Sequence, residues 1–221
     1  MPNFSTDANL LKWEPAILRE LALDHQCLAR GSGASSQTFS VVAEDAGFKT
    51  ARVAAGHVIH LRNDDQGIDG YYEVLSVESE TELQAGMLGG RGDEWVPLPT
   101  GTDLEFDIHT FDPQHEEARW ALLARFGLET DAADADTADG LDRWIFQRRV
   151  LRHASMALVL ATIYRGQAAG GPETSGLAQK ADHYARLYED EVAKARLVLD
   201  RDGDGRPDDV RSLSSHRLRR E

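Results

Sequence analysis

An aspartate-rich segment near the end of the chain has the residue types and spacing of a calcium-binding loop. It reads Asp200-Arg201-Asp202-Gly203-Asp204-Gly205-Arg206-Pro207-Asp208-Asp209. Carboxylates at alternate positions, followed by a glycine that can take a turn, wrap oxygen ligands around one hard cation. The expected ligands are Asp200, Asp202, Asp204, the backbone carbonyl of Arg206, and Asp208. The sequence therefore predicts Ca²⁺ as the candidate cofactor.

The second half of this loop departs from a full calcium-binding loop. The twelfth position is Arg211, where a complete loop has a bidentate glutamate, and Pro207 occupies the place of a small residue. A truncated loop binds weakly unless a remote carboxylate or a neighbouring subunit completes the ligand shell. The alternative is a solvated acidic turn that ends a helix, and the sequence leaves both interpretations open.

The chain becomes basic after the aspartates, and this end forms a candidate partner-binding segment. Its residues are Arg211, Leu213, His216, Arg217, Leu218, Arg219 and Arg220. A basic tail on an acidic protein is typical of a peptide that docks on an acidic surface. A disordered end without a partner is the alternative.

Motifs for catalysis are lacking elsewhere in the sequence. His57, His60, His109 and His115 have no metal-ligand spacing, and there is no His-Glu-x-x-His, no Gly-x-Ser-x-Gly and no phosphate-binding loop. Neighbouring carboxylates such as Glu116 and Glu117 cannot share one face of a helix. We therefore expect a protein that is not an enzyme.

The elements that position these segments change in character along the chain. Apolar residues at helical spacing predict a helix over Glu14–Arg30, followed by a flexible joint at Gly31–Gly33. Short β-branched and aromatic runs between Thr38 and Thr110 predict antiparallel strands. The clearest runs are 57–62, 71–77, 82–85 and 104–109, and the glycines of 86–92 predict a long hairpin.

Three helices are expected after the strands. Asp112 and Gly127 are placed to begin and end the first of them. The second, Leu141–Arg165, is apolar nearly all round in its middle, which indicates burial within a bundle or between subunits. The third carries an apolar stripe from Leu177 to Leu199.

These elements predict an α+β fold, a bundle of three to four helices with an inserted small antiparallel β-barrel of SH3-like type. The expected parts are an N-terminal helix joining the bundle (1–34), the barrel (35–110), the helical connector domain (111–199), and the aspartate-rich loop with its docking tail (200–221).

Composition restricts the possible partners. Lys and Arg total 24 against 38 Asp and Glu, which gives a formal net charge of −14 and a pI near 4.9. Such a surface repels phosphate backbones and anionic lipids, so tight binding to DNA or to a membrane is not expected. Cys27 is the single cysteine, which excludes an internal disulfide, and residues 1–8 lack the basic and then apolar pattern of a signal peptide. We expect synthesis in a cytoplasm.

Two parts of the sequence resemble structural proteins of tailed phages. The segments 56–61 (GHVIHL) and 70–77 (GYYEVLSV) resemble small barrels of phage structural proteins. The last helix, with Tyr184 and Tyr188, runs into Asp200–Gly205 and a basic end, which is similar to the C-terminal part of head-tail connector (neck adaptor) proteins of phages and prophages. The inserted β-module departs from the compact, all-helical connectors.

This resemblance implies a virion protein at the head-tail junction. It implies a homo-oligomeric ring, usually a dodecamer, that docks on the portal protein, contacts a tail, stopper or terminator protein, and surrounds passing DNA. The alternatives are a head- or tail-completion protein of the same junction and a calcium-binding adhesion module.

Overall fold

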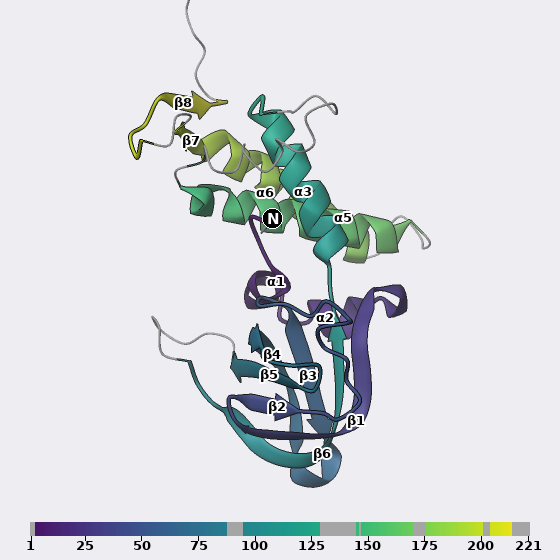
Figure 1. Ribbon diagram of the computed structural model, residues 1–221. Coiled ribbons are helices and arrows are strands. Elements are labelled where there is room, and N and C mark those ends of the chain that lie inside the picture. The colour runs from purple at the N-terminus through teal and green to yellow at the C-terminus, as the bar shows by residue number, and fades with distance from the viewer. Residues whose placement is uncertain are drawn as a thin grey trace, which may run out of the picture. The chain divides into compact units, whose positions relative to one another are not determined.

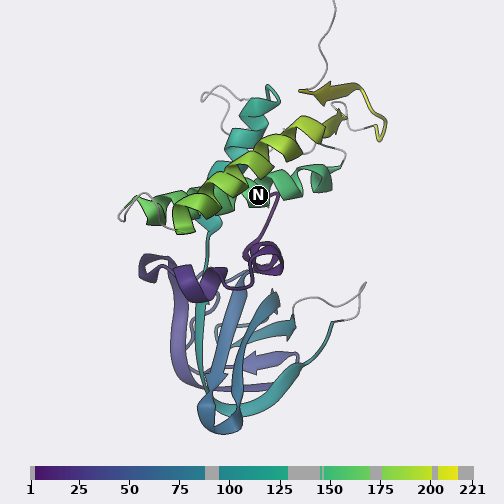
Figure 2. The same cartoon turned by 180° about the vertical axis from the view of Figure 1, so that it is seen from behind.

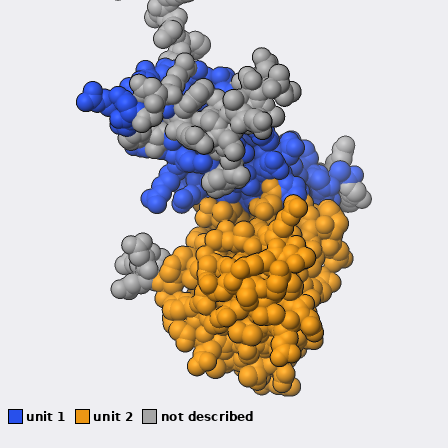
Figure 3. Space-filling view, viewed as in Figure 1, with its two compact units in different colours: residues 1–5, 113–221 blue, residues 6–112 orange. Residues whose placement is uncertain are grey.

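The contacts within the chain define two compact units. The computed structural model describes residues 3–87, 95–128, 145, 147–169, 176–200 and 204–213. One unit comprises residues 6–112, and the other comprises residues 1–5 and 113–221 (Figure 3). The first unit is therefore inserted, in sequence, between Ser5 and Pro113. Only five residues precede the insertion, rather than the 34 of the expected N-terminal part.

Residues 6–112 form a closed six-stranded barrel with short helices (Figure 1). The strands are β1 Cys27–Thr38, β2 Ser40–Val42, β3 Val58–Asn63, β4 Ile68–Val77, β5 Glu82–Met87 and β6 Leu98–His109. Their order around the barrel is β1-β2-β5-β4-β3-β6, and every neighbouring pair is antiparallel. This confirms the predicted antiparallel barrel. Most of the predicted 86–92 hairpin, from residue 88 onward, lies outside the described residues.

The helix predicted over Glu14–Arg30 is wrong. This stretch contains α2, Ile17–Leu21, and a short 3-10 turn, Asp24–Gln26, and then enters β1. Another helix, α1, precedes it at Asp7–Trp13. Pro15 lacks an N–H group and separates the two helices. The last residues become strand because they pair with β6, an interaction that local periodicity does not reveal.

The predicted flexible joint at Gly31–Gly33 is also part of β1. A Cβ atom on Gly31 would lie 2.7 Å from the Phe106 ring, so glycine is required there for close packing. Gly33 has φ of 75° at an irregularity in the pairing with β6. Both glycines therefore shape the barrel wall.

Side chains that point inward fill the barrel, and those that point outward create its polar surface. The interior is apolar and includes Val41, Phe48, Ile59, Leu61, Val74, Leu83, Leu104, Phe106 and Ile108. Because successive strand residues face opposite sides, His60 and Arg62 of β3 lie on the outside. The strand periodicity thereby positions the candidate site described below.

The second unit is mainly helical (Figures 1 and 2). It contains α3 Asp112–Arg125 from Pro113 onward, a 3-10 turn Arg148–Leu151, α5 Arg152–Ala168, α6 Gly176–Lys194, and a hairpin of β7 Arg196–Leu199 and β8 Asp209–Ser212. The predicted end of the first of these helices is confirmed, since Gly127 has φ of 64° two residues after α3. None of the described helices is long and apolar enough to cross a membrane.

Helix α5 is buried within a single copy of the chain. It begins at Arg152 rather than at Leu141, and residues 141–144 and 146 lie outside the described part. Nine of its residues are buried, and Tyr164 stacks on Tyr184 of α6 with ring centroids 5.8 Å apart. Its apolar surface therefore does not require a second subunit.

The last predicted helix ends earlier than its apolar stripe. Helix α6 stops at Lys194, and Arg196–Leu199 form β7. Leu197 and Leu199 are buried while Arg196 is exposed, which is the alternation of a strand. Pairing with β8 stabilises this conformation, so the aspartate-rich loop follows a strand and not a helix.

Candidate functional site

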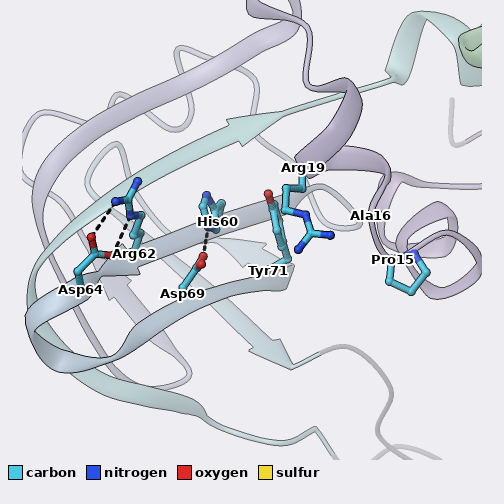
Figure 4. A pocket seen from close by; sticks show the side chains of 8 residues that line it. All are labelled: Pro15, Ala16, Arg19, His60, Arg62, Asp64, Asp69 and Tyr71. Atoms are coloured by element: carbon cyan, nitrogen blue, oxygen red, sulfur yellow. Dashed lines mark hydrogen bonds and ion pairs between the residues drawn. The ribbon is translucent and has the colours of Figure 1, made fainter.

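A hollow of the barrel unit lies between α2 and the outer face of β3 and β4 (Figure 4). Its volume is about 480 Å³, within the range of small-ligand sites. The lining residues are Pro15, Ala16 and Arg19 from the α2 region, His60 and Arg62 from β3, Asp64 from the following turn, and Asp69 and Tyr71 from β4. Sequence reasoning selected none of them as site residues.

A row of outward-facing side chains crosses four strands at this hollow. His60 lies opposite Tyr71 on β4 and opposite Asp107 on β6, and Asp107 lies opposite Arg30 on β1. Cross-strand neighbours of this kind are close enough for direct contact. The barrel register thus assembles a phenol, an imidazole, a carboxylate and a guanidinium from strands far apart in sequence.

His60 is held by carboxylates at both ring nitrogens. Its Nε2 lies 2.7 Å from Asp69 Oδ1 and its Nδ1 lies 3.2 Å from Asp107 Oδ2. The Tyr71 ring stacks on the imidazole, with centroids 4.4 Å apart and planes 13° from parallel. The hydrogen bond with Asp107 is the main cause that raises the pKa of His60 above its ordinary value, although partial burial opposes it. The arrangement favours the imidazolium form.

Asp107 connects His60 to a second histidine. His109 Nε2 lies 3.4 Å from Asp107 Oδ1, and its Nδ1 is 3.2 Å from the carbonyl oxygen of Leu23. Partial burial alone would raise the pKa of Asp107. The hydrogen bond from His60 and the nearby positive charges outweigh this effect, so the pKa of Asp107 lies below its ordinary value. The two pKa shifts, upward for His60 and downward for Asp107, both favour the ion pair between these residues.

These contacts suit an ionic link between β3, β4 and β6 better than they suit proton transfer. A general base needs an imidazole nitrogen with a free lone pair, and both nitrogens of His60 already face carboxylates. Arg62 is bound by Asp64 through two hydrogen bonds of 2.8 and 3.0 Å, which lowers the pKa of Asp64. The guanidinium of Arg19 has no hydrogen bond or salt bridge within the described residues.

A second hollow adjoins the first and is strongly acidic. It has a volume of about 330 Å³ and is lined by Arg62, Asn63, Asp64, Asp65, Asp103 and Glu105. Residues 6–112 carry 19 Asp and Glu against seven Lys and Arg, a formal net charge of −12. The rest of the chain carries 19 against 17. The acidic excess of the protein thus belongs almost entirely to the barrel unit.

A further cluster in the barrel unit has the residue types of a metal site. Asp7, His57 and Asp112 place one ligand atom each within 4.8 Å of one another. However, Nδ1 of His57 accepts a hydrogen bond from the Ala54 N–H at 3.1 Å, so Nε2 carries the proton and donates to Asp112 at 2.9 Å. Metal binding at Nε2 would move that proton to Nδ1, against the Ala54 N–H. The cluster therefore fits a structural role better than a metal site.

The predicted calcium ligands lie in and beside the loop between β7 and β8. The Asp200 carboxylate is buried and accepts a hydrogen bond from the Gly205 N–H at 2.9 Å, and Asp204 accepts one from the Arg206 N–H at 2.8 Å. Asp204, Arg206 and Asp208 are exposed, and Asp202 lies outside the described residues. Asp200 and Asp204 thus accept hydrogen bonds from backbone N–H groups of residues 205 and 206, and Ca²⁺ binding stays a prediction.

The predicted partner-binding segment has both internal and exposed contacts. Arg211 donates from Nη1 to the carbonyl oxygens of Phe126 and Gly127, both at 2.6 Å, and so satisfies the C-terminal end of α3. This gives Arg211 an internal role that the sequence did not reveal. Leu213 is 42% exposed, whereas His216, Arg217, Leu218, Arg219 and Arg220 lie outside the described residues.

The helical unit contains a buried serine–histidine cluster. Ser5 Oγ lies 2.8 Å from His115 Nδ1 on α3 and 2.7 Å from Ser155 Oγ on α5, and all three residues are buried. The neighbouring Phe4 belongs to the apolar core of this unit. The contacts attach the first residues of the chain to two helices, which indicates a structural role.

Comparisons with known proteins add no relative to this picture. No protein-family model, no curated protein and no solved structure matches the chain.

Proposed function

We propose that the chain is a structural virion protein of a phage or prophage neck, a ring-forming head-tail connector that docks on the portal and forms part of the DNA channel. The observation that carries the proposal is the formal charge of −12 on residues 6–112. A negative wall repels DNA phosphates and lets DNA pass without being retained. The resemblance of the barrel segments and the C-terminal region to phage neck proteins supports the same role.

The filled barrel determines how such a channel would be built. The barrel interior is occupied by apolar side chains and cannot itself conduct DNA. DNA would pass through the centre of a ring, along the outer faces of barrels from successive copies. The acidic face formed by Asp64, Asp65, Asp103 and Glu105 is the part of the described surface best suited to this position.

We also propose that the chain is a bundle of three to four helices with an SH3-like barrel. Its copies would form a ring, usually a dodecamer, between the portal and a tail, stopper or terminator protein. Since α5 is buried within one copy, contacts between copies would use other surfaces. Exposed Val210 and Leu213 on and beside β8 are candidates for such contacts.

Assembly with the portal tests the proposal directly. The purified chain, alone and mixed with the portal protein of the same genome, would be examined by mass photometry and electron microscopy. We expect a ring, or a ring that forms only on the portal. A chain that remains monomeric under both conditions would refute the proposal, and a ring at a different level of the particle would favour a head- or tail-completion protein.

DNA retention provides an independent test. We expect no binding to duplex DNA in about 100 mM salt, because the acidic face repels phosphates. Replacement of Asp64, Asp65, Asp103 and Glu105 by lysine should create salt-sensitive DNA binding. Tight DNA binding by the unmodified chain would contradict the role of the acidic face.

A further inference from the structure

We propose that the acidic outer face of the barrel is the receptor for the basic C-terminal segment, residues 214–221, of a second copy of the chain. This inference deepens the proposed function and rests on it, because contacts from one copy to the next are what a ring requires. It assigns the tail to a neighbouring subunit rather than to the portal.

The charges of the two surfaces are complementary. Residues 214–221 read SSHRLRRE and contain Arg217, Arg219 and Arg220 with the single acidic residue Glu221. The barrel unit has a formal net charge of −12, whereas all other residues together have −2. Opposite charges of this size steer association and fix its orientation. Within this protein, the barrel unit is therefore the receptor that charge favours. A bound tail adds three arginines and one glutamate, so the formal charge of the barrel unit changes from −12 to −10 and the wall of the channel stays negative.

The barrel surface also offers hollows with available acceptors. The hollows of about 480 and 330 Å³ share Arg62 and Asp64 and lie next to each other on the outer face. Around the smaller one, the carboxylates of Asp65, Asp103 and Glu105 are exposed and make no hydrogen bond or salt bridge within the described residues. A carboxylate with both oxygens available can bind a guanidinium through two parallel hydrogen bonds. Arginine side chains therefore suit this surface in shape and in chemistry.

The described residues that precede the segment are accessible. It follows β8, where Val210 is 50% exposed, and Leu213, which is 42% exposed. The eight residues after Leu213 would span at most about 28 Å when extended. A contact from the tail of one copy to the barrel of the next is a head-to-tail interface, and such interfaces close into rings when the rotation permits.

Self-association of a truncated chain and binding of the free tail test this inference. Sedimentation velocity would compare the full chain with a chain that lacks residues 214–221, at 50 and 300 mM NaCl. A labelled SSHRLRRE peptide would then be titrated into the truncated chain. We expect oligomers of the full chain at low salt, their loss on truncation or at high salt, and salt-sensitive binding of the peptide.

Variants locate the binding surface. The double variant Asp103→Asn, Glu105→Gln should weaken peptide binding about fivefold to tenfold, because two exposed acceptors lose their charge. The matched control is Glu44→Gln, Asp45→Asn, which makes the same charge change at exposed residues of the same unit and should bind the peptide normally. Circular dichroism checks that both variants are folded.

The possible outcomes separate this inference from the proposed function. Equal peptide binding by both double variants, or unchanged oligomers after truncation, would overturn it. A full chain that stays monomeric while its tail occupies its own barrel would overturn it as well. If the peptide binds the portal and not the barrel, the proposed function stands and this inference is refuted. If the peptide binds the barrel but the chain never assembles on the portal, this inference stands and the proposed function is refuted.

Discussion

Replacement of His60 by glutamine should destabilise the barrel at pH 6 and have little effect at pH 9. His60 connects β3 to β4 through Asp69 and to β6 through Asp107. Glutamine retains polarity but cannot carry the positive charge that both carboxylates favour. The side chain of Asp69 is 72% exposed, so its bond contributes little, whereas Asp107 is 32% exposed and contributes more.

The size and the sign of this effect follow from the two ionisations. One partly buried, charge-assisted hydrogen bond contributes about 1–2 kcal/mol to the free energy of unfolding. Folding raises the pKa of His60. The stabilisation by His60 is therefore complete at pH values below its pKa in the unfolded chain, and it is lost as the pH rises through its pKa in the folded chain. Because folding lowers the pKa of Asp107, its contribution is lost only as the solution becomes acidic. The difference between wild type and variant should therefore be largest near pH 5–6.

Calorimetry at two pH values can measure this difference. For a unit of this size, about 1 kcal/mol corresponds to roughly 4–8 °C in melting temperature. We expect the His60→Gln variant to melt several degrees lower at pH 6 and within about 1 °C of wild type at pH 9. The control is His25→Gln, an exposed histidine of the same unit. An equal decrease in melting temperature at both pH values would show that His60 acts through packing. No decrease at pH 6 would refute the ionic link of His60 with Asp69 and Asp107.

Three other predictions concern the helical unit and its hairpin. The Arg211→Ala variant should lower the free energy of unfolding by about 1–2 kcal/mol, since two carbonyl oxygens at the end of α3 lose their donor. The control variant Arg206→Ala should leave it unchanged, and urea unfolding measures both. Millimolar Ca²⁺ should raise the melting temperature of the wild type but not of an Asp200→Ala, Asp204→Ala double variant, and an equal rise in both would exclude the loop as the site. The Ser5→Ala variant should lower the free energy of unfolding by about 1–2 kcal/mol, because two buried hydrogen bonds are removed, and unchanged stability would show that the neighbouring groups rearrange.

The barrel could be predicted from sequence because its signals are local. Residues 59–62 and 104–108 alternate between buried apolar side chains and more exposed polar ones, and turn residues separate the runs. Gly127 likewise marks the end of α3 through its own backbone conformation. Such features depend on near neighbours in the chain, so composition and spacing are sufficient to recognise them.

The incorrect predictions share one physical cause. Both Glu14–Arg30 and the stretch that ends at Leu199 contain apolar residues at helical spacing, yet each ends as a strand. In both cases a partner strand, β6 or β8, supplies hydrogen bonds and buries one face. Short apolar runs fit either conformation, and the distant partner decides between them.

The sequence by itself determined the inserted antiparallel barrel, the helices that follow it, and the acidic and basic segments of the chain. Only the tertiary structure placed His60 against Asp69 and Asp107, brought Arg211 to the end of α3, and concentrated the negative charge on one unit. These contacts join residues up to 85 positions apart, and strand register and helix packing decide which side chains meet.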